Sequence, residues 1–296
     1  MKHNKSIKKL AICIPTFNRA KLLDRLLKSI PKSTKIVVSI CDDGSSDDTF
    51  DIVNRHKSRF LIKYSYQKNA GRASALRNAI LNVNAQFMLI MGSDDYFTKN
   101  GIKTILNTLK KNKSIKFFVF PTAIQNKIGS TSEHLKGIPL TNYVKLRSDF
   151  KIKRDLKEVV DHKIMKTAMY NKPKKIRRIP TSYLWFKISK IVDCLPVKSR
   201  PVIIIEYSED GMSKNLFSLK INNPKYIALT YKMAMMSKRY SSKIYRFRYA
   251  ILYYRYSFHD KTIKLIKFRD LPLFIIGYVL GISDLLRLAM MKIKIY

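Results

Sequence analysis

The sequence predicts an α/β protein with a mostly parallel sheet flanked by helices, followed by a basic helical extension at the C-terminus. Two observations support this fold class. In the first 120 residues, short β-branched or apolar runs alternate with segments of helical periodicity. Beyond Asn222 the chain becomes aromatic, basic and helical in pattern. Strands that alternate with helices of this length indicate βαβ units, whose strands run parallel.

The expected elements follow one another along the chain in a regular alternation. Strands are expected where apolar or β-branched residues run together, at 10–17, 35–43, 62–68, 87–91 and 115–122. Helices are expected where apolar residues recur every three or four positions, at 20–30, 47–56, 74–83 and 101–112. A further strand candidate is PVIIIEY at 201–207. In such a sheet the ligand binds beyond the carboxyl ends of the strands.

The composition is that of a globular protein with an unusual charge. A chain of 296 residues, 46% of them apolar, can bury a substantial core as one large domain or two smaller ones. The 59 Lys and Arg residues against 20 Asp and Glu give a net charge of +39. Such an excess implies attraction to something polyanionic, and nucleic acid, anionic lipid and phosphorylated substrates are all open.

The three cysteines, Cys13, Cys41 and Cys194, are isolated and have no metal-ligand spacing. They are expected to be reduced, buried thiols of a cytosolic protein, and no zinc site is expected. The basic N-terminus imitates a signal peptide, but Pro15 cuts its apolar run short. This segment is therefore expected to be the first strand.

Three loops at predicted strand ends carry the informative residues: PTFNR at 15–19, DDGSSDD at 42–48 and GSDD at 92–95. Of the eight acidic residues among the first 100, six lie in the second and third of these loops. Because the carboxyl ends of parallel strands meet at one edge, this segregation predicts a negative pocket there.

The loop DDGSSDD follows a strand and precedes a helix. Ser45, Ser46 and Asp47 are residue types that also form turns and N-caps, and that role is open for them. Asp42 and Asp43 differ, because a carboxylate that ends a buried strand needs a hydrogen bond or a ligand. A pyrimidine ring with its N–H donor would satisfy such a carboxylate.

The loop GSDD contains two neighbouring carboxylates, Asp94 and Asp95, which repel each other more strongly when buried. Positive charge is therefore expected beside them. Mg²⁺ or Mn²⁺ binds through one or two carboxylates plus phosphate oxygens, which suits this loop. The alternative is a turn that only caps the helix beginning near Thr98. In KNAGRASALRN, Gly71 lies at a strand-to-helix turn with arginines that attract phosphate.

The segments AICIPTFNR, CDDGSSDDT, NAGRASALRN and MLIMGSDD, in this order and spacing, resemble glycosyltransferase family 2 over roughly residues 8–125. The resemblance implies a GT-A fold. It also implies transfer of a sugar, with inversion, from a nucleotide-sugar donor that is expected to be a UDP-sugar. The acceptor would be a hydroxyl of a cell-surface glycan or lipid-linked oligosaccharide, as in lipopolysaccharide or other polysaccharide biosynthesis. The chain has no GxxxxGK[ST] or GxGxxG segment, which argues against P-loop and dinucleotide-binding proteins.

The resemblance also implies roles for individual residues. Those implied to bind the nucleotide are Pro15, Thr16, Asn18, Arg19, Asp42, Asp43, Gly71, Arg72, Asn78 and Ser93. The implied metal residues are Asp94 and Asp95, with Mn²⁺ or Mg²⁺ as the cofactor. Residues 1–221 would form the transferase domain, with a nucleotide-sugar half at about 8–125 and an acceptor half at about 126–221.

The chain departs from the family pattern in two places. Gly92 stands where many members begin the metal motif with Asp, so the metal would be held by fewer protein oxygens. Thr181 and Ser182 stand where an acid is expected before Trp185. The reaction still needs a carboxylate to take the proton of the acceptor hydroxyl. The candidates are Asp161, which is preferred, Asp95, Glu158 and the pair Glu209 and Asp210.

The C-terminal region, 222–296, is expected to be basic, amphipathic and membrane-associating. Between 226 and 259 it has no acidic residue, and its apolar residues form a helical stripe that includes Met236, Ile244 and Phe247. Packing of that stripe on the protein is the alternative. The thirteen uncharged residues at 271–283 are too few to span a bilayer and predict an interfacial element on an anionic membrane surface. The expected location is the cytoplasmic face of the inner or plasma membrane, with peripheral or monotopic attachment.

Two other functions are compatible with part of the sequence. A nucleic-acid-binding protein would explain the charge but not the acidic loops at strand ends, so no nucleic acid partner is expected. A non-catalytic GT-A domain would explain Gly92 and the missing acid near Trp185.

Overall fold

The computed structural model describes residues 7–125, 134–173, 176–206, 216–237, 243–261 and 270–293. Its packing divides the chain into two compact units. The first comprises Met1–Thr141, Ile152–Arg177 and Lys190–Ser208, and the second comprises Asn142–Lys151, Arg178–Ser189 and Glu209–Tyr296. The second unit thus joins two earlier segments, 142–151 and 178–189, to the C-terminal helices, and the domain boundary expected between residues 221 and 222 stays a prediction.

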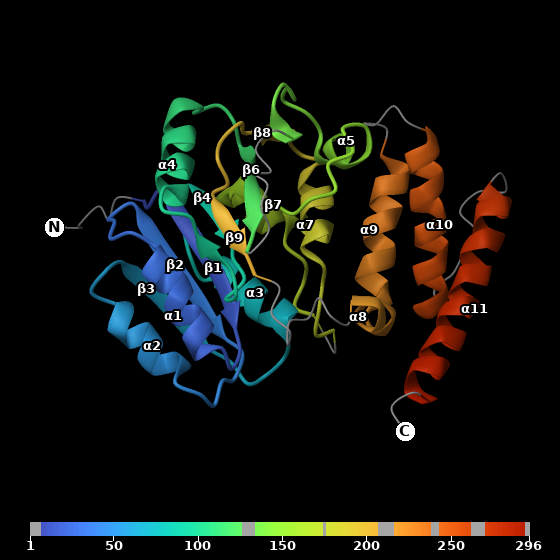
Figure 1. Cartoon of the computed structure of the whole chain (residues 1–296), viewed down its shortest axis with the longest axis horizontal. Coiled ribbons are helices and arrows are strands. Elements are labelled where there is room, and N and C mark those ends of the chain that lie inside the picture. Colours follow the sequence, from blue (N-terminus) through green and yellow to red (C-terminus); the bar gives the residue numbers. More distant parts are fainter. Residues whose placement is uncertain are drawn as a thin grey trace. The chain divides into compact units, whose positions relative to one another are not determined.

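The first unit holds the sheet (Figure 1). Its strands are β1 Leu10–Thr16, β2 Ile36–Asp42, β3 Leu61–Tyr66, β4 Phe87–Ile90, β5 Tyr96–Phe97, β6 Phe117–Ile124, β7 Leu156–Asp161, β8 Leu195–Pro196 and β9 Ile203–Ile205. They lie in the order β3-β2-β1-β4-β7-β6-β9-β5, with β8 beside β6. The pairs among β1 to β4 are parallel, whereas β7 runs antiparallel to both β4 and β6.

The helices of this unit connect the strands and pack near the sheet. They are α1 Ala20–Ser29, α2 Thr49–His56, α3 Arg72–Leu81, α4 Gly101–Lys111 and α6 His162–Ala168. Helix α3 packs against β1 and β2, and α1 packs against α2. Every strand and helix expected within the first 125 residues is present, with ends shifted by a few residues. The mostly parallel α/β fold class is therefore confirmed.

Strands β1 and β2 are buried along their whole length. A parallel strand that is covered on both faces needs apolar side chains on both, which explains why these segments read as continuous apolar runs. Fully burying one Leu or Ile side chain contributes about 1.5–3 kcal/mol, so these strands form the stable base from which the loops project. All three cysteines are free thiols buried in the protein.

The second unit is helical. Its helices are α5 Tyr143–Ser148, α7 Thr181–Ile188, α8 Leu216–Asn222, α9 Pro224–Met236, α10 Lys243–His259 and α11 Leu271–Ile293. Helix α10 packs against both α9 and α11 (Figure 1). The predicted apolar stripe is wrong for the first half of α10, where Ile244 and Phe247 are 76% and 51% exposed, but it holds in the second half, where Tyr254 is buried.

Helix α11 is 23 residues long, ten more than the uncharged run that predicted it. It continues through Asp284 because this side chain is buried and bonded to α10: Arg255 Nε and Nη2 donate to it at 2.8 and 2.5 Å, and His259 Nε2 lies 3.0 Å away. In the described part of the chain, the helical segment Leu271–Leu288 is long and apolar enough to cross a membrane, as judged by length and composition alone.

Candidate active site at the carboxyl edge of the sheet

The carboxyl ends of β1, β2 and β4 meet at one edge of the sheet. Thr16 and Asp42, the last residues of β1 and β2, are register partners. Met91, just beyond β4, donates its backbone N–H to the carbonyl of Cys13 on β1 at 3.0 Å. The loops 15–19, 42–48 and 92–95 therefore lie at a common edge, which we call the carboxyl-edge site.

Hydrogen bonds tie the first two loops together. Asn18 has a positive φ of 47° and accepts from the backbone N–H of Ser46 at 2.8 Å, while its own N–H donates to Ser45 Oγ at 2.9 Å. Asp47 accepts from the N–H of Ala20 at 2.9 Å and from Thr49 Oγ1 at 2.5 Å. Burial opposes ionisation of Asp47, but these bonds outweigh it and lower its pKa. The serines and Asp47 thus have the turn and capping roles left open from the sequence.

Asp42 and Asp43 are both buried, at 2% and 4% exposure. Asp42 accepts from the N–H of Ser45 at 2.8 Å and from the Tyr64 hydroxyl at 2.8 Å. Asp43 accepts three hydrogen bonds, from Gln67 Nε2 at 2.6 Å and from the N–H groups of residues 70 and 71 at 2.8 Å each. A carboxylate has about four acceptor positions, so Asp42 has more capacity left for a ligand than Asp43.

Gln67 was missed from the sequence, although it connects several expected site residues. Besides donating to Asp43, its Oε1 accepts from Asn78 Nδ2 at 2.6 Å and from Ser74 Oγ at 3.2 Å. Asn78 therefore acts on the site through Gln67 within the described structure. A single Gln directly after a strand has no distinctive pattern, so the sequence offered no signal for it.

Gly71 occupies a position that no other residue fits. Its φ is +91°, and a Cβ placed there would lie 2.6 Å from the Cα and 2.7 Å from the carbonyl oxygen of Arg177. The chain at Arg177 thus crosses directly over the turn, where its carbonyl also accepts from the N–H of Ala73 at 3.0 Å. This close approach holds the start of α3, and with it Arg72, at the carboxyl edge.

The paired aspartates have protein cations beside them, as their mutual repulsion required. Arg19 Nη1 lies 2.6 Å from Asp94 Oδ2, and Lys157 Nζ lies 3.7 Å from Asp95 Oδ2. Burial raises the pKa of Asp95, Lys157 lowers it and Asp94 raises it further, so the net direction is upward. Arg72 also interacts electrostatically with both carboxylates.

Arg25 holds the acidic loop from a second side. Its Nη2 donates to the backbone carbonyl of Asp94 at 2.7 Å, and its Nη1 forms an ion pair with Glu206, directly after β9. The guanidinium also lies 4.7 Å from the centre of the Tyr96 ring. Neither Arg25 nor Lys157 was predicted, because each comes from a helix or strand whose contact with this loop depends on the fold.

The donor set suits a hard divalent cation that takes most of its ligands from a diphosphate. Asp94 and Asp95 offer carboxylate oxygens, the ligand type that Mg²⁺ and Mn²⁺ prefer. Within the described ranges there is no group of three or more His, Cys, Asp or Glu residues that could hold a metal by itself. Gly92 leaves room for the acidic loop, since a Cβ there would lie 2.5 Å from Asp94 Oδ1.

Two further predicted residues are buried at this edge. Ser93 is 4% exposed and Thr16 is 3% exposed. Thr16 Oγ1 has no hydrogen-bond partner among the residues that the structure describes. A buried hydroxyl without a partner is costly, so this atom marks a place where a ligand's polar atom would be stabilising. Pro15 lies beside it, beyond the part of β1 that pairs with β4.

The preferred base, Asp161, does not lie at this edge. It is the register partner of Phe87, the first residue of β4, whereas Asp94 follows the last residue of that strand. Asp161 caps α6 by accepting from the N–H groups of Lys163 and Ile164. The assignment failed because β7 runs antiparallel to β4, which the sequence could not indicate. Glu158 and Lys157 alternate along β7, so Glu158 faces away from Asp95. Glu209 and Asp210 lie outside the described residues.

Comparison with known proteins is consistent with this geometry. The chain is 32% identical over 136 residues to the GalNAc(5)-diNAcBac-PP-undecaprenol beta-1,3-glucosyltransferase of Campylobacter jejuni, a match that covers 44% of this chain and 42% of that protein. The chain thus spans less than half of that relative, and its match to a Rickettsia conorii glycosyltransferase covers 21% of the relative.

Two solved structures share the fold. The Staphylococcus aureus TarS structure with UDP-GlcNAc aligns with a TM-score of 0.64 at 16% identity, covering 91% of this chain and 79% of that one. A mannosyltransferase from Pyrobaculum calidifontis, in complex with GDP-Man and Mn²⁺, aligns with a TM-score of 0.55 at 11% identity, covering 96% and 88%. The model of glycosyl transferase family 2 matches residues 11–176, more than half of the chain. The chain belongs to glycosyl transferase family 2.

Proposed function

We propose that this protein transfers a sugar, with inversion, from a nucleotide-diphosphosugar to a hydroxyl of a glycan or lipid-linked acceptor. The observation that carries the proposal is the carboxyl-edge site, where the buried acids Asp42 and Asp43 follow β2, and Asp94 and Asp95 follow β4 with Arg19, Arg72 and Lys157 around them. Family membership supports the reaction type. The Campylobacter relative is named for a lipid-linked oligosaccharide acceptor, and the TarS structure contains a UDP-sugar.

The charge of the site suits a diphosphate. Arg19, Arg25, Arg72 and Lys157 contribute four positive charges, while Asp94, Asp95 and Glu206 contribute three negative ones. These charges around the acidic loop sum to +1, and a bound divalent cation would raise the sum to +3, which would attract a donor diphosphate. Asp42, with its remaining acceptor positions, is the better placed of the two buried acids to bind a pyrimidine N–H, and Thr16 Oγ1 would bind a polar atom of the nucleotide.

Asp94 and Asp95 would hold Mn²⁺ or Mg²⁺ together with the donor diphosphate. When bound, the cation would stabilise the negative charge that grows on the departing diphosphate. The chain's own residues position these carboxylates. Arg25 fixes the backbone of the acidic loop, and Arg19 and Lys157 orient the two carboxylates. The Pyrobaculum structure, which contains Mn²⁺ with GDP-Man, supports a divalent ion in this fold.

Inversion requires the acceptor hydroxyl to attack the anomeric carbon opposite the diphosphate while a carboxylate takes its proton. Of the acids named for this step, Asp95 is the one described at the site, beside Lys157, which supports it as the candidate base. Asp210 is retained as the alternative base.

A thermal-shift panel of UDP, GDP, CMP and their sugar conjugates, with and without Mn²⁺, tests the donor site. We expect one nucleotide to raise the melting temperature, with a larger shift in Mn²⁺, because a ligand bound only by the native state stabilises it by mass action. The Asp94→Asn variant should lose the Mn²⁺-dependent part, and Asp161→Asn, the matched control at the opposite edge, should keep it. No shift for any nucleotide in folded protein would contradict the proposal.

We further propose that the second unit attaches the enzyme to an anionic membrane surface at the cytoplasmic face. One face of α11, at Gly277, Gly281 and Asp284, packs on α10, where a Cβ at either glycine would lie 2.5 Å from a side chain of that helix. The other face exposes large apolar side chains: Ile275, Ile276, Val279, Ile282, Leu286 and Met290 are each 42–62% exposed. A helix with one face packed on the protein and an exposed apolar face opposite is suited to lie in the interfacial plane of a bilayer.

The basic surface of α10 favours the same partner, since each Lys or Arg near an anionic leaflet contributes about 1 kcal/mol. In vesicle flotation, the protein should float with anionic vesicles in low salt and stay partly bound in 1 M salt through α11. The variant Ile275→Ser with Val279→Ser should be released by salt. Full release of the wild-type protein by salt would contradict apolar docking.

A further inference from the structure

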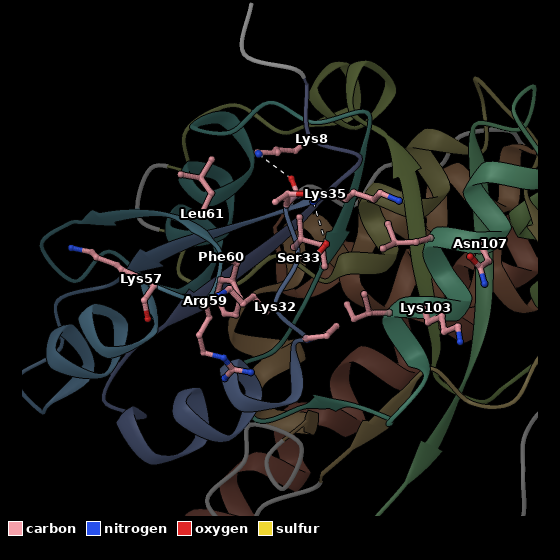
Figure 2. A pocket seen from close by; sticks show the side chains of 16 residues that line it. Lys8, Lys32, Ser33, Lys35, Lys57, Arg59, Phe60, Leu61, Lys103 and Asn107 are labelled. Carbon is pink, nitrogen blue, oxygen red and sulfur yellow. Dashed lines mark hydrogen bonds between the residues drawn. The ribbon is translucent and has the colours of Figure 1, made fainter. Parts of the chain in front are cut away.

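Two adjoining hollows lie at the opposite edge of the same sheet, where β1, β2 and β3 begin. The first, of about 780 Å³, is shown in Figure 2. The second, of about 840 Å³, shares with it Lys8, Thr34, Lys35, Leu106 and Asn107. Because they share these residues, the hollows form one continuous surface, which we call the amino-edge cleft. It contains none of the residues of the carboxyl-edge site.

The amino-edge cleft is almost purely cationic. The described lining of the first hollow contains no carboxylate and has six cations: Lys8, Lys32, Lys35, Lys57, Arg59 and Lys103. The second hollow adds Lys9, Lys110, Lys113 and Lys116. Its one acid is Asp161, which lies 3.5 Å from Lys116. Lys8 and Lys9 donate to neutral oxygens, of Thr34 and Gln86, so those contacts leave their charge uncompensated.

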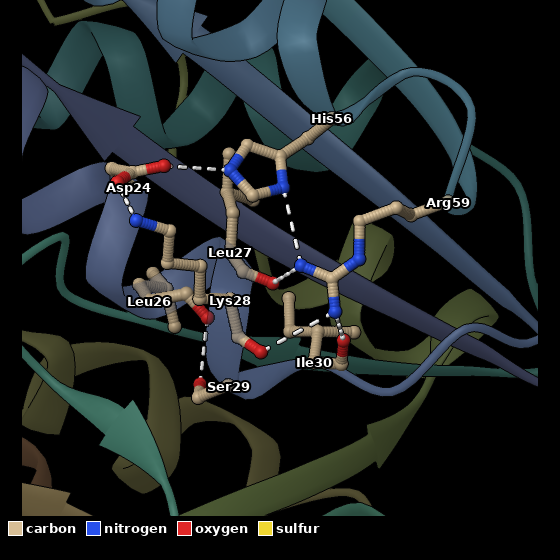
Figure 3. A network of polar contacts seen from close by, with 8 residues as sticks. All are labelled: Asp24, Leu26, Leu27, Lys28, Ser29, Ile30, His56 and Arg59. Carbon is tan, nitrogen blue, oxygen red and sulfur yellow. Dashed lines mark hydrogen bonds and ion pairs between the residues drawn. The ribbon is translucent and has the colours of Figure 1, made fainter.

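One cation of the cleft is fixed by the fold rather than free on the surface. Arg59 donates to the carbonyls of Leu27, Lys28 and Ile30 at 3.3, 3.4 and 3.0 Å, which end helix α1 (Figure 3). Because an arginine can only donate, His56 Nδ1 must be the acceptor in their 3.3 Å contact. Nε2 of His56 therefore carries the proton and donates to Asp24 at 2.8 Å. This network gives the cleft a rigid positive wall beside flexible lysines.

We propose that the amino-edge cleft binds a glycan chain that carries phosphate groups, through phosphate contacts with its lysines. Ten cations spread over two joined hollows suit a row of phosphates better than a single one. Polar groups on the same lining, from Ser33, Thr34, Ser58 and Asn107, can bond to sugar hydroxyls. Figure 2 shows labelled lysines on several sides of the hollow.

The lining disfavours the two other polyanions. Single-stranded nucleic acid is bound by stacking its bases on exposed aromatic rings, but the aromatic residues of the cleft, Phe60 and Phe87, are 5% and 4% exposed. A bilayer binds apolar side chains on a surface that it can lie against, whereas this surface is hollowed. A flexible hydroxyl-rich phosphate chain fits both features.

The cleft lies at the far edge of the sheet from the transfer site, so it would hold a part of the polymer remote from the reacting end. That last step, in which the polymer is the acceptor, rests on the proposed transferase function; the binding itself does not. A long acceptor is therefore expected to stay bound between transfers, because a second contact raises the effective concentration of its reacting end at the transfer site.

The test is equilibrium binding of fluorescein-labelled poly(glycerol phosphate) to the full chain, followed by anisotropy over a range of salt concentrations. The cleft variant replaces Lys32, Lys35 and Lys103 by Gln. The control replaces Lys153, Lys190 and Lys198, exposed lysines of the same unit outside the cleft, and removes the same net charge. Three exposed charge contacts predict about tenfold weaker binding for the cleft variant. The control should weaken binding less than about twofold.

Four results would overturn the proposal: no polymer binding, equal weakening in both variants, tighter binding of an oligodeoxynucleotide with the same number of phosphates, or competition by anionic vesicles through the same three lysines. Donor binding is measured separately by the thermal-shift panel, which both variants should leave unchanged. If no nucleotide raised the melting temperature while the polymer still bound, that result would therefore count against the transferase function alone.

Discussion

The two edges of the sheet in the first unit have opposite character. At the carboxyl edge, acids are hydrogen-bonded or ion-paired, as in the contacts of buried Asp43 with Gln67 and of Asp94 with Arg19. At the amino edge, lysines are exposed and outnumber a single carboxylate, Asp161. A parallel sheet separates these sets because residues that follow strands gather at one edge and residues that precede them gather at the other. The net charge of +39 therefore conceals two surfaces of different chemistry.

The difference also concerns how each edge is held. The fully buried acids at the carboxyl edge, such as Asp43, are hydrogen-bonded to loops, so their substitution should affect both folding and ligand binding. The lysines at the amino edge mostly face solvent, and surface charges of that kind contribute little to stability. Substitutions that compare the edges should separate effects on activity from effects on the fold.

The largest expected effect is the loss of transfer in Asp94→Ala. Removal of a group that holds charge at the leaving diphosphate should lower kcat about 100-fold or more while the melting temperature stays near that of the wild type. The comparison is Asp161→Ala at the other edge, where loss of the α6 cap should cost about 1 kcal/mol of stability and leave kcat within about twofold. A reversed pattern in steady-state kinetics would show that the edges have been assigned wrongly.

The next effect is that of Gly71→Ala on stability. A positive φ combined with a clash against the backbone of Arg177 should cost about 2–3 kcal/mol in urea unfolding, and nucleotide binding should weaken as the turn moves. Gly137→Ala is a suitable control, because that glycine has a φ of +75° but no atom within 4 Å of its Cβ position. Equal losses in the two variants would mean that backbone strain, and not the crossing at residue 177, matters here.

A smaller effect is expected for Arg59→Ala at the amino edge. The carbonyls that end α1 lose a charged donor, which should cost about 1–2 kcal/mol in chemical denaturation. Lys57→Ala, a neighbouring cation of the same cleft, should change stability by less than about 0.5 kcal/mol. Neither variant should alter KM for the donor, and a raised KM in either would connect the two edges.

The smallest effect concerns acid stability. Burial alone would raise the pKa of Asp24, but Lys28 and His56 outweigh it, so the folded-state pKa lies below the ordinary value. A lowered pKa stabilises the fold above the unfolded-state value of about 4, and that stabilisation is lost as pH falls through the folded-state pKa. Asp24→Asn should therefore reduce the drop in unfolding free energy between pH 5 and 3, measured against wild type at each pH. If the drop in unfolding free energy were the same in the variant as in the wild type, Asp24 would not be a cause of the acid destabilisation.

The parts of the fold that could be predicted from the sequence were those that depend on the local pattern of apolar and polar residues. The strands 10–17 and 35–43 read as apolar runs because both faces are covered, and the loops at 42–48 and 92–95 hold six of the eight acidic residues among the first 100. Lys157 and Arg25 could not be predicted, since an isolated basic residue among 59 gives no sign of its partner. Asp161 was misplaced because its edge depends on the direction of β7.

The C-terminal helices show a different limit. Tyrosine has an apolar ring and a polar hydroxyl, so a helix with tyrosines on several sides has no unique apolar stripe. In α10 the buried residues include Tyr249, Tyr253 and Tyr256, which the predicted stripe omitted, beside Tyr254, which it contained. Only packing against α9 and α11 decides between those faces.

The strand order has a consequence for synthesis on the ribosome. Strand β7, at Leu156–Asp161, lies between β4 and β6, although both precede it in the chain. Until residue 161 has left the exit tunnel, one edge of β4 has no partner and the nucleotide-sugar half at 8–125 is not a finished folding unit. A nascent chain stalled near residue 125 should thus remain dependent on chaperones, and the domain should be completed late in translation.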